Sequence, residues 1–280
     1  MADSQKRQGK KPGARVIAVT SGRGGVGKTN FSASLSIVLA ELGNSVTLLD
    51  MDLGQTNVSM LLDIKPEYNL DDIVSGNKGI DAISVTTQYG VRIVRGASGD
   101  EVLAELDDEK KKKLVNAMER LCIANDYVII DTGAGYSKNT GIFTESADEV
   151  IVVTTPGATS MMDAYAAIKL MKQHVPDMFI HLVVNMARGE QEARNAISKL
   201  QSMASHFIHG RLEEDGFIPM DDKVKDAVKH HTPFIIYDPA CFASLALTRI
   251  ANTITNMHTS PSGHIHDRKE TFYSRLLHAL

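Results

Sequence analysis

The feature that most constrains this chain is the segment Gly22-Arg23-Gly24-Gly25-Val26-Gly27-Lys28-Thr29. It directly follows an apolar run at residues 16–19 and precedes a helical pattern that begins near Phe31. Glycines in such a turn let successive backbone N–H groups point at an anion, and the following helix adds the positive end of its dipole. A strand, this turn and a helix therefore favour a nucleoside triphosphate site over a glycine-rich helix cap.

The loop assigns roles to individual side chains. We expect Lys28 to reach the β- and γ-phosphates and the Thr29 hydroxyl to bind Mg²⁺. The residues expected to contact the nucleotide here are Gly22, Arg23, Gly24, Gly25, Val26, Gly27, Lys28, Thr29 and Asn30.

Apolar runs separated by helical patterns recur along the chain. Such runs, which lack polar alternation, are typical of strands covered on both faces, so we predict an α/β fold with a doubly wound, mostly parallel sheet flanked by helices. Ligands of such sheets bind at the carboxyl ends of the strands. The predicted strands are 16–19, 45–49, 91–94, 127–130, 150–155, 180–184 and 217–218, and the predicted helices are 31–42, 109–124, 160–174, 191–205, 222–230 and 242–255.

Acidic residues follow two of these strands. Asp50 and Asp52 end the second strand, and Asp131 ends the run at 127–130. A carboxylate that closes an apolar strand beside a phosphate loop usually orients the Mg²⁺ shell, so Thr29, Asp50, Asp52 and Asp131 are the candidate metal ligands. Asp52 is our candidate for orienting the attacking water, and a helix-capping aspartate is the alternative role for each carboxylate.

Composition limits the classes of function. A net charge of −4 gives no overall attraction to DNA or anionic lipid, so any such contact must be local. Cys122 and Cys241 form no Cys-x-x-Cys pair, which argues against a metal cluster and fits a reducing compartment. The first residues lack the apolar core of a signal peptide, and no run approaches the ~18 apolar residues that span a bilayer.

The motifs together resemble those of the MinD/ParA family of P-loop ATPases, over about residues 15–256. Residues 22–29 resemble the family's deviant Walker A loop, Asp50-x-Asp52-x-Gly54 its first switch and residues 131–135 its second. Asn185 resembles the asparagine that reads adenine, and Pro219 with Asp221 resembles the loop that closes over the base. The resemblance thus adds Asn185, Pro219 and Asp221 to the expected nucleotide-binding residues.

Within the family, four phrases resemble the FlhG/FleN group of flagellar number regulators, namely residues 49–58, 90–99, 163–170 and 185–187. The resemblance implies a Mg²⁺-dependent ATPase that forms a homodimer around ATP and docks on the inner face of the bacterial cytoplasmic membrane. It also implies action with the GTPase FlhF and with a flagellar transcriptional regulator or basal-body protein. It implies catalytic roles for Lys28, Arg23, Asp52 and Asp131.

Two residues depart from the family pattern. Arg23 stands where the family has a lysine that reaches the partner's phosphates, and Gly157 stands where relatives often carry a glutamate near the dimer interface. An arginine keeps the charge but offers a planar fork to phosphate oxygens. The basic tail at residues 1–14, expected to be flexible, also lacks the element with which some FlhG proteins stimulate FlhF.

Residues 257–267 read as a linker, and residues 268–280 as a short basic amphipathic helix. Its apolar stripe suits either an interfacial membrane anchor or a helix that folds back onto the protein's own surface. The helix can have both roles if it is folded back without ATP and is released when ATP binds. The stripe comprises Phe272, Tyr273, Leu276, Leu277 and Leu280.

Three other functions stay open from the sequence. The first is a MinD-type ATPase of cell-division site selection. The second is a ParA-type DNA-segregation ATPase; the acidic net charge and the amphipathic end argue against direct DNA binding. The third is a nucleotide-binding scaffold with little turnover, suggested by Arg23 and Gly157.

Overall fold

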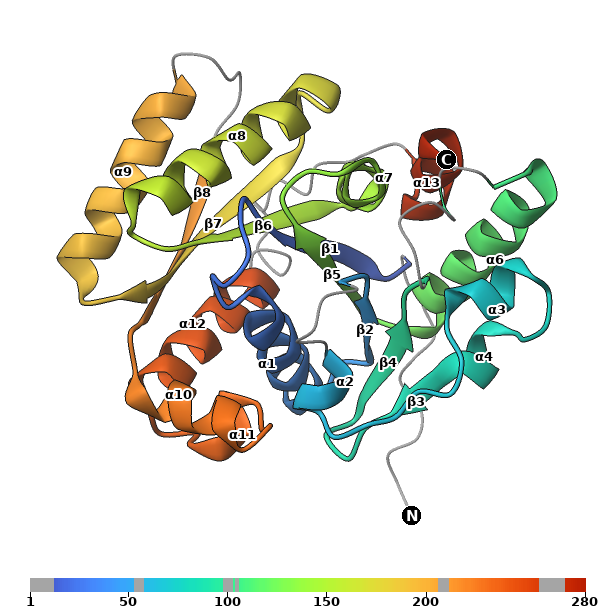
Figure 1. Ribbon diagram of the computed structural model, residues 1–280, viewed down its shortest axis with the longest axis horizontal. Coiled ribbons are helices and arrows are strands. Elements are labelled where there is room, and N and C mark those ends of the chain that lie inside the picture. Colours follow the sequence, from blue (N-terminus) through green and yellow to red (C-terminus); the bar gives the residue numbers. More distant parts are fainter. Residues whose placement is uncertain (1–12, 53–57, 98–102, 104–105, 206–211, 257–269) are drawn as a thin grey trace.

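A single eight-stranded sheet forms the centre of the part of the chain described by this computed structural model, residues 13–52, 58–97, 103, 106–205, 212–256 and 270–280 (Figure 1). The strand order is β3-β4-β2-β5-β1-β6-β7-β8, and every neighbouring pair is parallel except β3–β4. This arrangement confirms the predicted fold class. The strands are β1 (Arg15–Ser21), β2 (Val46–Asp50), β3 (Ser84–Thr86), β4 (Val91–Arg95), β5 (Tyr127–Ala134), β6 (Glu149–Thr154), β7 (Phe179–Ala187) and β8 (Leu212–Pro219).

Helices cover both faces of the sheet (Figure 1). One core lies beneath α1, α2, α10, α11 and α12, and the other lies beneath α3, α4, α6, α7, α8, α9 and α13. Their bounds are α1 (Lys28–Glu41), α2 (Val58–Leu61), α3 (Leu70–Val74), α4 (Ile80–Ile83), α6 (Asp108–Ala124), α7 (Lys138–Ser146), α8 (Ala158–His174), α9 (Glu190–Ser205), α10 (Asp222–Lys229), α11 (Phe234–Tyr237), α12 (Phe242–Asn256) and α13 (Phe272–Ala279).

Strand β1 shows why the apolar runs lack alternation. Val16 and Ala18 belong to one core, and Ile17 and Val19 belong to the other. Successive side chains of a strand point to opposite faces, and all four are almost fully buried here. A strand sandwiched between two helical layers must therefore be apolar at every position.

Some elements were not predicted from the sequence. Strand β5 was expected to end at Ile130, but it continues to Ala134 because it pairs with β1 from Arg15↔Tyr127 to Ser21↔Ala134. Helix α7 lacks a clear apolar period and contains Gly141; the Ser137 side chain caps it by accepting a hydrogen bond from Thr140 N. The short antiparallel edge strand β3 was also missed.

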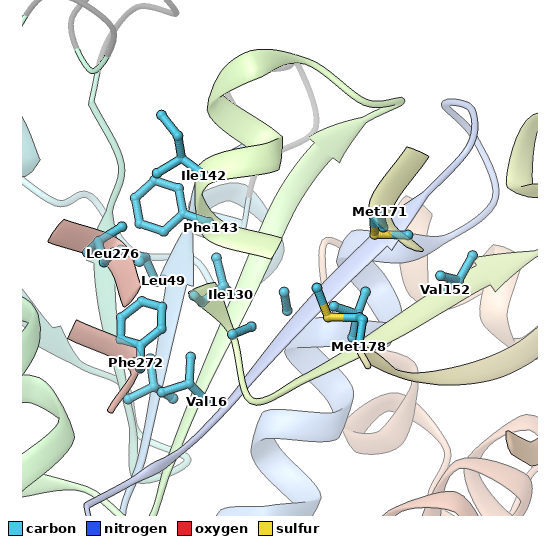
Figure 2. Packing of buried hydrophobic residues seen from close by; sticks show 14 of the residues in the cluster. Val16, Leu49, Ile130, Ile142, Phe143, Val152, Met171, Met178, Phe272 and Leu276 are labelled. Carbon is cyan, nitrogen blue, oxygen red and sulfur yellow. The ribbon is translucent and has the colours of Figure 1, made fainter. Parts of the chain in front are cut away.

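The C-terminal helix α13 lies beside α6 and α7 (Figures 1 and 2). Phe272 and Leu276 are 3% and 0% exposed and form part of the core, whereas Leu277 is 44% exposed. Arg275 Nε donates to the Ser146 carbonyl at 2.8 Å, and its guanidinium pairs with Asp148 at 2.5 Å. In this structure the helix is therefore folded back onto the protein. Tyr273 and Leu280 are partly buried against the same core.

The predicted linker at 257–267 and most of the basic tail at 1–14 lie outside the described residues. Among the helices that the structure does describe, none has the length and apolar character needed to cross a membrane.

The packing of α13 against the core can be tested by substituting two leucines of the helix in turn. Leu276→Asp places a carboxylate in an apolar pocket, which costs several kcal/mol, so the helix should detach. We expect amide hydrogen exchange over residues 272–280 to become fast while exchange in β1 and β5 stays slow.

Leu277→Asp is the matched control, because Leu277 is half exposed and should leave the helix in place. Equal protection of residues 272–280 in the two variants, measured by mass spectrometry, would contradict the observed packing.

Candidate nucleotide site

The phosphate loop is held in shape by glycines and by a side chain from β7. Gly25 and Gly27 have φ of +80° and +87°, in the left-handed region that favours glycine. A Cβ on Gly27 would lie 2.4 Å from Nδ2 of Asn185, which donates a hydrogen bond to the Val26 carbonyl at 2.8 Å. Asn185 thus contacts the loop itself, and its predicted role in reading adenine stays a prediction.

Gly22 sets how closely the loop approaches helix α8. A Cβ at this position would lie 2.1 Å from the carbonyl carbon of Asp163 and 2.3 Å from the Ala164 nitrogen. Because both atoms belong to backbone, a larger residue would force the loop and the helix apart. The phosphate loop therefore rests directly on the peptide groups of α8.

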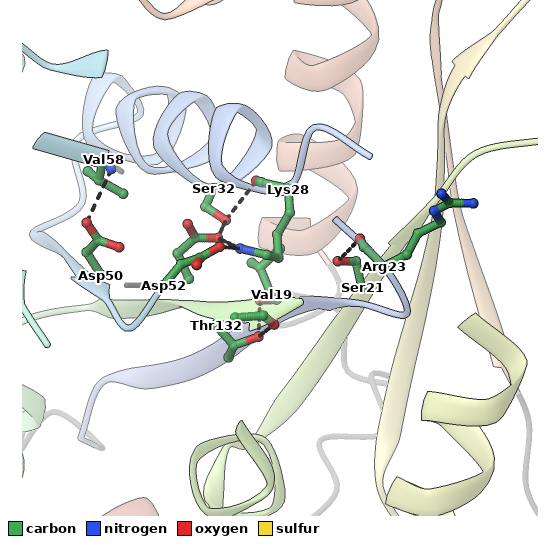
Figure 3. Close-up of polar contacts among 11 residues, drawn as sticks. Val19, Ser21, Arg23, Lys28, Ser32, Asp50, Asp52, Val58 and Thr132 are labelled. Carbon is green, nitrogen blue, oxygen red and sulfur yellow. Dashed lines mark hydrogen bonds and ion pairs between the residues drawn. The ribbon is translucent and has the colours of Figure 1, made fainter. Parts of the chain in front are cut away.

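Lys28 lies at the centre of a buried ionic cluster (Figure 3). Its Nζ atom is 3.0 Å from Asp52 Oδ2 and 3.0 Å from Asp131 Oδ1, and the side chain is 5% exposed. Burial opposes the charge, but the attraction of Asp131 and then Asp52 raises the pKa of Lys28. The structure thus brings together three of the predicted site residues, and the lysine is cationic.

Ser32 joins the cluster and was not predicted. Its hydroxyl donates to Asp131 Oδ1 at 2.8 Å and lies one helical turn after Lys28. Residues four apart share a helix face, so the spacing between Lys28 and Ser32 is the sequence feature that could have predicted the position of Ser32 beside Lys28. Ser32 fixes the orientation of the Asp131 carboxylate.

Asp50 lies directly beside Asp131, because the two are register partners in β2 and β5. Burial, followed by the charge of Asp131, raises the pKa of Asp50 from 3.8 to about 7. Its Oδ2 accepts a hydrogen bond from Val58 N at 3.2 Å. Both Asp50 and Asp131 lie within strands, so neither occupies the N-cap position of a helix. Asp50 nevertheless accepts from the first N–H group of α2, which agrees in part with the alternative capping role.

Several buried oxygens beside the loop lack hydrogen-bond partners among the described residues. They are Oδ1 of Asp50, Oδ2 of Asp131 and Oδ1 of Asn30. Buried polar atoms normally have partners, and oxygen ligands with bound water are what Mg²⁺ prefers. The donor set of Asp50 and Asp131, with Thr29 in the first turn of α1, therefore fits the predicted metal ion.

The two predicted residues on the last strand have a local structural role. Asp221 caps α10 by accepting from Lys223 N at 2.9 Å, and its other oxygen accepts from Ala243 N at 3.3 Å. Pro219 is the last residue of β8. Their positions at the carboxyl edge agree with the expected place of the base, and contact with a nucleotide stays a prediction.

Arg23 does not join the Lys28 cluster. Its side chain is exposed and points away from Lys28 (Figure 3). Gly157 is the residue before α8 and supplies no side-chain cap to that helix. Both departures from the family pattern thus lie outside the buried cluster.

Comparison with known proteins identifies the family. A ParA family model, described as an NUBPL iron-transfer P-loop NTPase, matches residues 13–255. The chain belongs to the ParA/MinD family of P-loop NTPases.

Named relatives agree with this assignment. The antiactivator FleN of Pseudomonas aeruginosa is 35% identical, over 97% of this chain and 96% of that protein. The flagellum site-determining protein YlxH of Helicobacter pylori is 29% identical, over 95% and 91% of the two chains. Among solved structures, MinD in the MinC:MinD cell division protein complex of Aquifex aeolicus gives a TM-score of 0.72 at 27% identity, covering 87% of this chain and 96% of that one.

The description of the family model names iron transfer, for which this chain shows no cysteine pair. Cys122 belongs to one core of the sheet and Cys241 to the other. Burial raises the pKa of the Cys122 thiol to about 12, so it is not a thiolate ligand near neutral pH.

The raised pKa of Asp50 predicts a pH dependence of stability. Asp50 is protonated more readily in the folded than in the unfolded chain. Its contribution to the free energy of unfolding is therefore complete below about pH 4 and is lost as pH rises through about 7. A pKa change from 3.8 to about 7 corresponds to roughly 4 kcal/mol. Asp50→Asn should therefore lose less free energy of unfolding than the wild type between pH 4 and pH 8.

Urea unfolding of the nucleotide-free protein at several pH values measures this difference. Asp81→Asn serves as the control, because the Asp81 side chain is 83% exposed and should leave the wild-type pH dependence intact. Parallel curves for the wild type and Asp50→Asn would show that Asp50 titrates normally in the folded protein.

Proposed function

We propose that this protein is an ATPase that dimerises around ATP, associates with the cytoplasmic membrane and regulates the number or placement of flagella. The observation that carries the proposal is the buried Lys28 ammonium, 3.0 Å from each of two carboxylates beneath the phosphate loop. The extent of similarity to FleN and YlxH supports the flagellar role.

The chemistry proposed is hydrolysis of ATP to ADP and phosphate. Lys28 and the loop N–H groups bind the phosphates, and Thr29, Asp50 and Asp131 hold Mg²⁺ directly or through water. When bound, Mg²⁺ neutralises charge on the phosphate oxygens. Asp52 orients the attacking water once the phosphates take its place on Lys28. Asp52 is suited to this change because its side chain is 25% exposed, whereas Asp131 is fully buried.

The orientation of Arg23 supports the proposed dimerisation. A guanidinium that points away from its own loop lysine is placed to grip phosphate held by a second copy (Figure 3). An arginine supplied in trans raises phosphoryl-transfer rates by about 10³–10⁵ in other systems. The γ-phosphate then acts as the contact that holds the two copies face to face.

Membrane association is assigned to α13. Because Phe272 and Leu276 are buried, docking on the protein competes with docking on lipid, and the helix must leave its seat to bind a bilayer. One short helix holds a membrane only weakly, comparable to a single acyl chain at about 10⁴ M⁻¹. Two helices on one dimer gain about 10²-fold or more through effective concentration, which makes dimerisation the membrane switch.

The partners proposed are the flagellar GTPase FlhF and a flagellar transcriptional regulator or basal-body protein. A second candidate function is cell-division site selection, favoured by the likeness to MinD solved in complex with MinC. A deletion strain distinguishes them, because the first function predicts altered flagellar number and the second predicts misplaced septa.

Turnover tests the enzymatic part. We expect Lys28→Ala to lose nucleotide binding, because the phosphates lose their buried cation. Asp52→Ala should retain ATP binding and hydrolyse it at least about 100-fold more slowly than the wild type. Phosphate release and fluorescent-nucleotide binding measure the two properties. Lys110→Ala, on the exposed start of α6, is the control. Equal, negligible turnover in all four proteins would favour a non-hydrolysing scaffold.

Vesicle binding tests the membrane part. Deletion of residues 268–280 should abolish ATP-dependent co-sedimentation with phosphatidylglycerol-containing vesicles and leave nucleotide affinity unchanged. Leu277→Asp should also weaken sedimentation, since Leu277 belongs to the stripe but not to the buried seat. Undiminished binding by the truncated protein would exclude α13 as the anchor.

A further inference from the structure

A cavity of about 530 Å³ lies beside the phosphate loop, between the loop, the β6–α8 connection and the segment that follows β7. Of the described residues around it, none is Lys28, Asp50, Asp52 or Asp131, so the cavity is separate from the buried ionic cluster. Residues 23–26 contribute to its wall, as do Gly157 and Arg188. A ligand here would contact the outer side of the loop that holds the chain's own phosphates.

The lining of this cavity favours an anion. Arg23 and Arg188 are both exposed, and neither guanidinium has a hydrogen bond or ion pair with a residue in the described part of the chain. Glu192 is the one carboxylate among the described residues of the lining, and it accepts a hydrogen bond from the backbone nitrogen of Arg188 at 2.6 Å. Gly157 adds no side chain. The part of the wall that the structure describes thus carries two cations and one anion.

The backbone that carries Arg188 is fixed relative to the phosphate loop. Met186 has φ of +58°, and its nitrogen donates to Asn185 Oδ1 at 2.9 Å. The other end of the Asn185 amide donates to Val26 in the loop. Ala187 is fully buried, and Glu192 holds the Arg188 nitrogen. Arg188 is therefore presented from a short, hydrogen-bonded turn that is tied to the loop bearing Arg23.

We infer that Arg188 is a second basic residue that binds, together with Arg23, the polyphosphate of the nucleotide held by a second copy of this chain. The inference rests on the proposed ATP-dependent dimer. The chain's own phosphates are assigned to Lys28 on the other side of the loop, so an anion that meets both arginines comes from another molecule. Two guanidinium forks match a triphosphate in both charge and hydrogen-bond geometry.

The test uses the hydrolysis-deficient Asp52→Ala protein as the parent and measures its dimerisation constant with Mg·ATP by sedimentation velocity. Adding Arg188→Ala should weaken dimerisation by about 10- to 100-fold, because charge-assisted bonds across the interface are lost. Affinity for fluorescent ADP and the melting temperature should stay at the parental values. Arg188→Lys should restore part of the lost dimerisation, since it returns the charge without the fork.

Arg194→Ala is the matched control: Arg194 is an exposed arginine on α9, paired with Glu190 and absent from the cavity wall. It should dimerise as the parent does. Parental dimerisation by the Arg188→Ala protein would overturn the role of Arg188 and leave the proposed function standing. An equal loss of ADP affinity would overturn it too, by placing Arg188 on its own nucleotide. Failure of the parent itself to dimerise with Mg·ATP would overturn both proposals.

Discussion

A buried ammonium group needs negative charge close by, and the rest of this structure is arranged to provide it at Lys28. Two carboxylates meet its Nζ atom at 3.0 Å in a site from which water is largely excluded. Removing one partner of such a buried pair leaves an uncompensated charge, which is strongly destabilising. A triphosphate would offer the same compensation, so the proposed binding of nucleotide is an exchange of one anion for another on a cation that stays buried.

The parallel sheet makes this cluster possible. Strands β2, β5 and β1 are neighbours, so their carboxyl ends bring Asp50, Asp131 and the phosphate loop to one edge. Strand β5, which carries Asp131, leads through a short connection into α7, and α13 packs against α7. The candidate nucleotide site is thus linked to the C-terminal helix through β5, α7 and the packing of α13 on α7 (Figure 1).

The parts that the sequence predicts well depend on local patterns. The phosphate loop and the central strands follow from glycine spacing and from apolar runs. These patterns also bring Lys28 and Asp131 to one edge of the sheet, although Asp131 lies within β5 rather than at its end. The contact of Ser32 with Asp131 depends on helix phase and tertiary approach, which no short motif records. Strand β3 is three residues long and exists because β4 offers it an edge.

The packing of α13 shows a second limit of prediction from the sequence. Phe272 and Leu276 form the same stripe whether the helix binds lipid or the protein core, because both environments favour apolar side chains on one face of the helix. Only the tertiary structure reveals the packing of α13 against α6 and α7 and the pairing of Arg275 with Asp148. The role of Asp221 is ambiguous in the sequence for a similar reason, since a helix cap and a nucleotide contact both favour an aspartate.

The exchange of anions on Lys28 can be observed directly by NMR of the side-chain ammonium group in ¹⁵N-lysine-labelled protein, assigned with Lys28→Arg. Saturating Mg²⁺ and a non-hydrolysable ATP analogue should shift the Lys28 resonance. They should leave that of Lys172 in place, because Lys172 is another buried lysine and donates to the Pro176 carbonyl. A Lys28 resonance that does not move at saturation would contradict the account, because the carboxylates would then still hold the cation assigned to the phosphates.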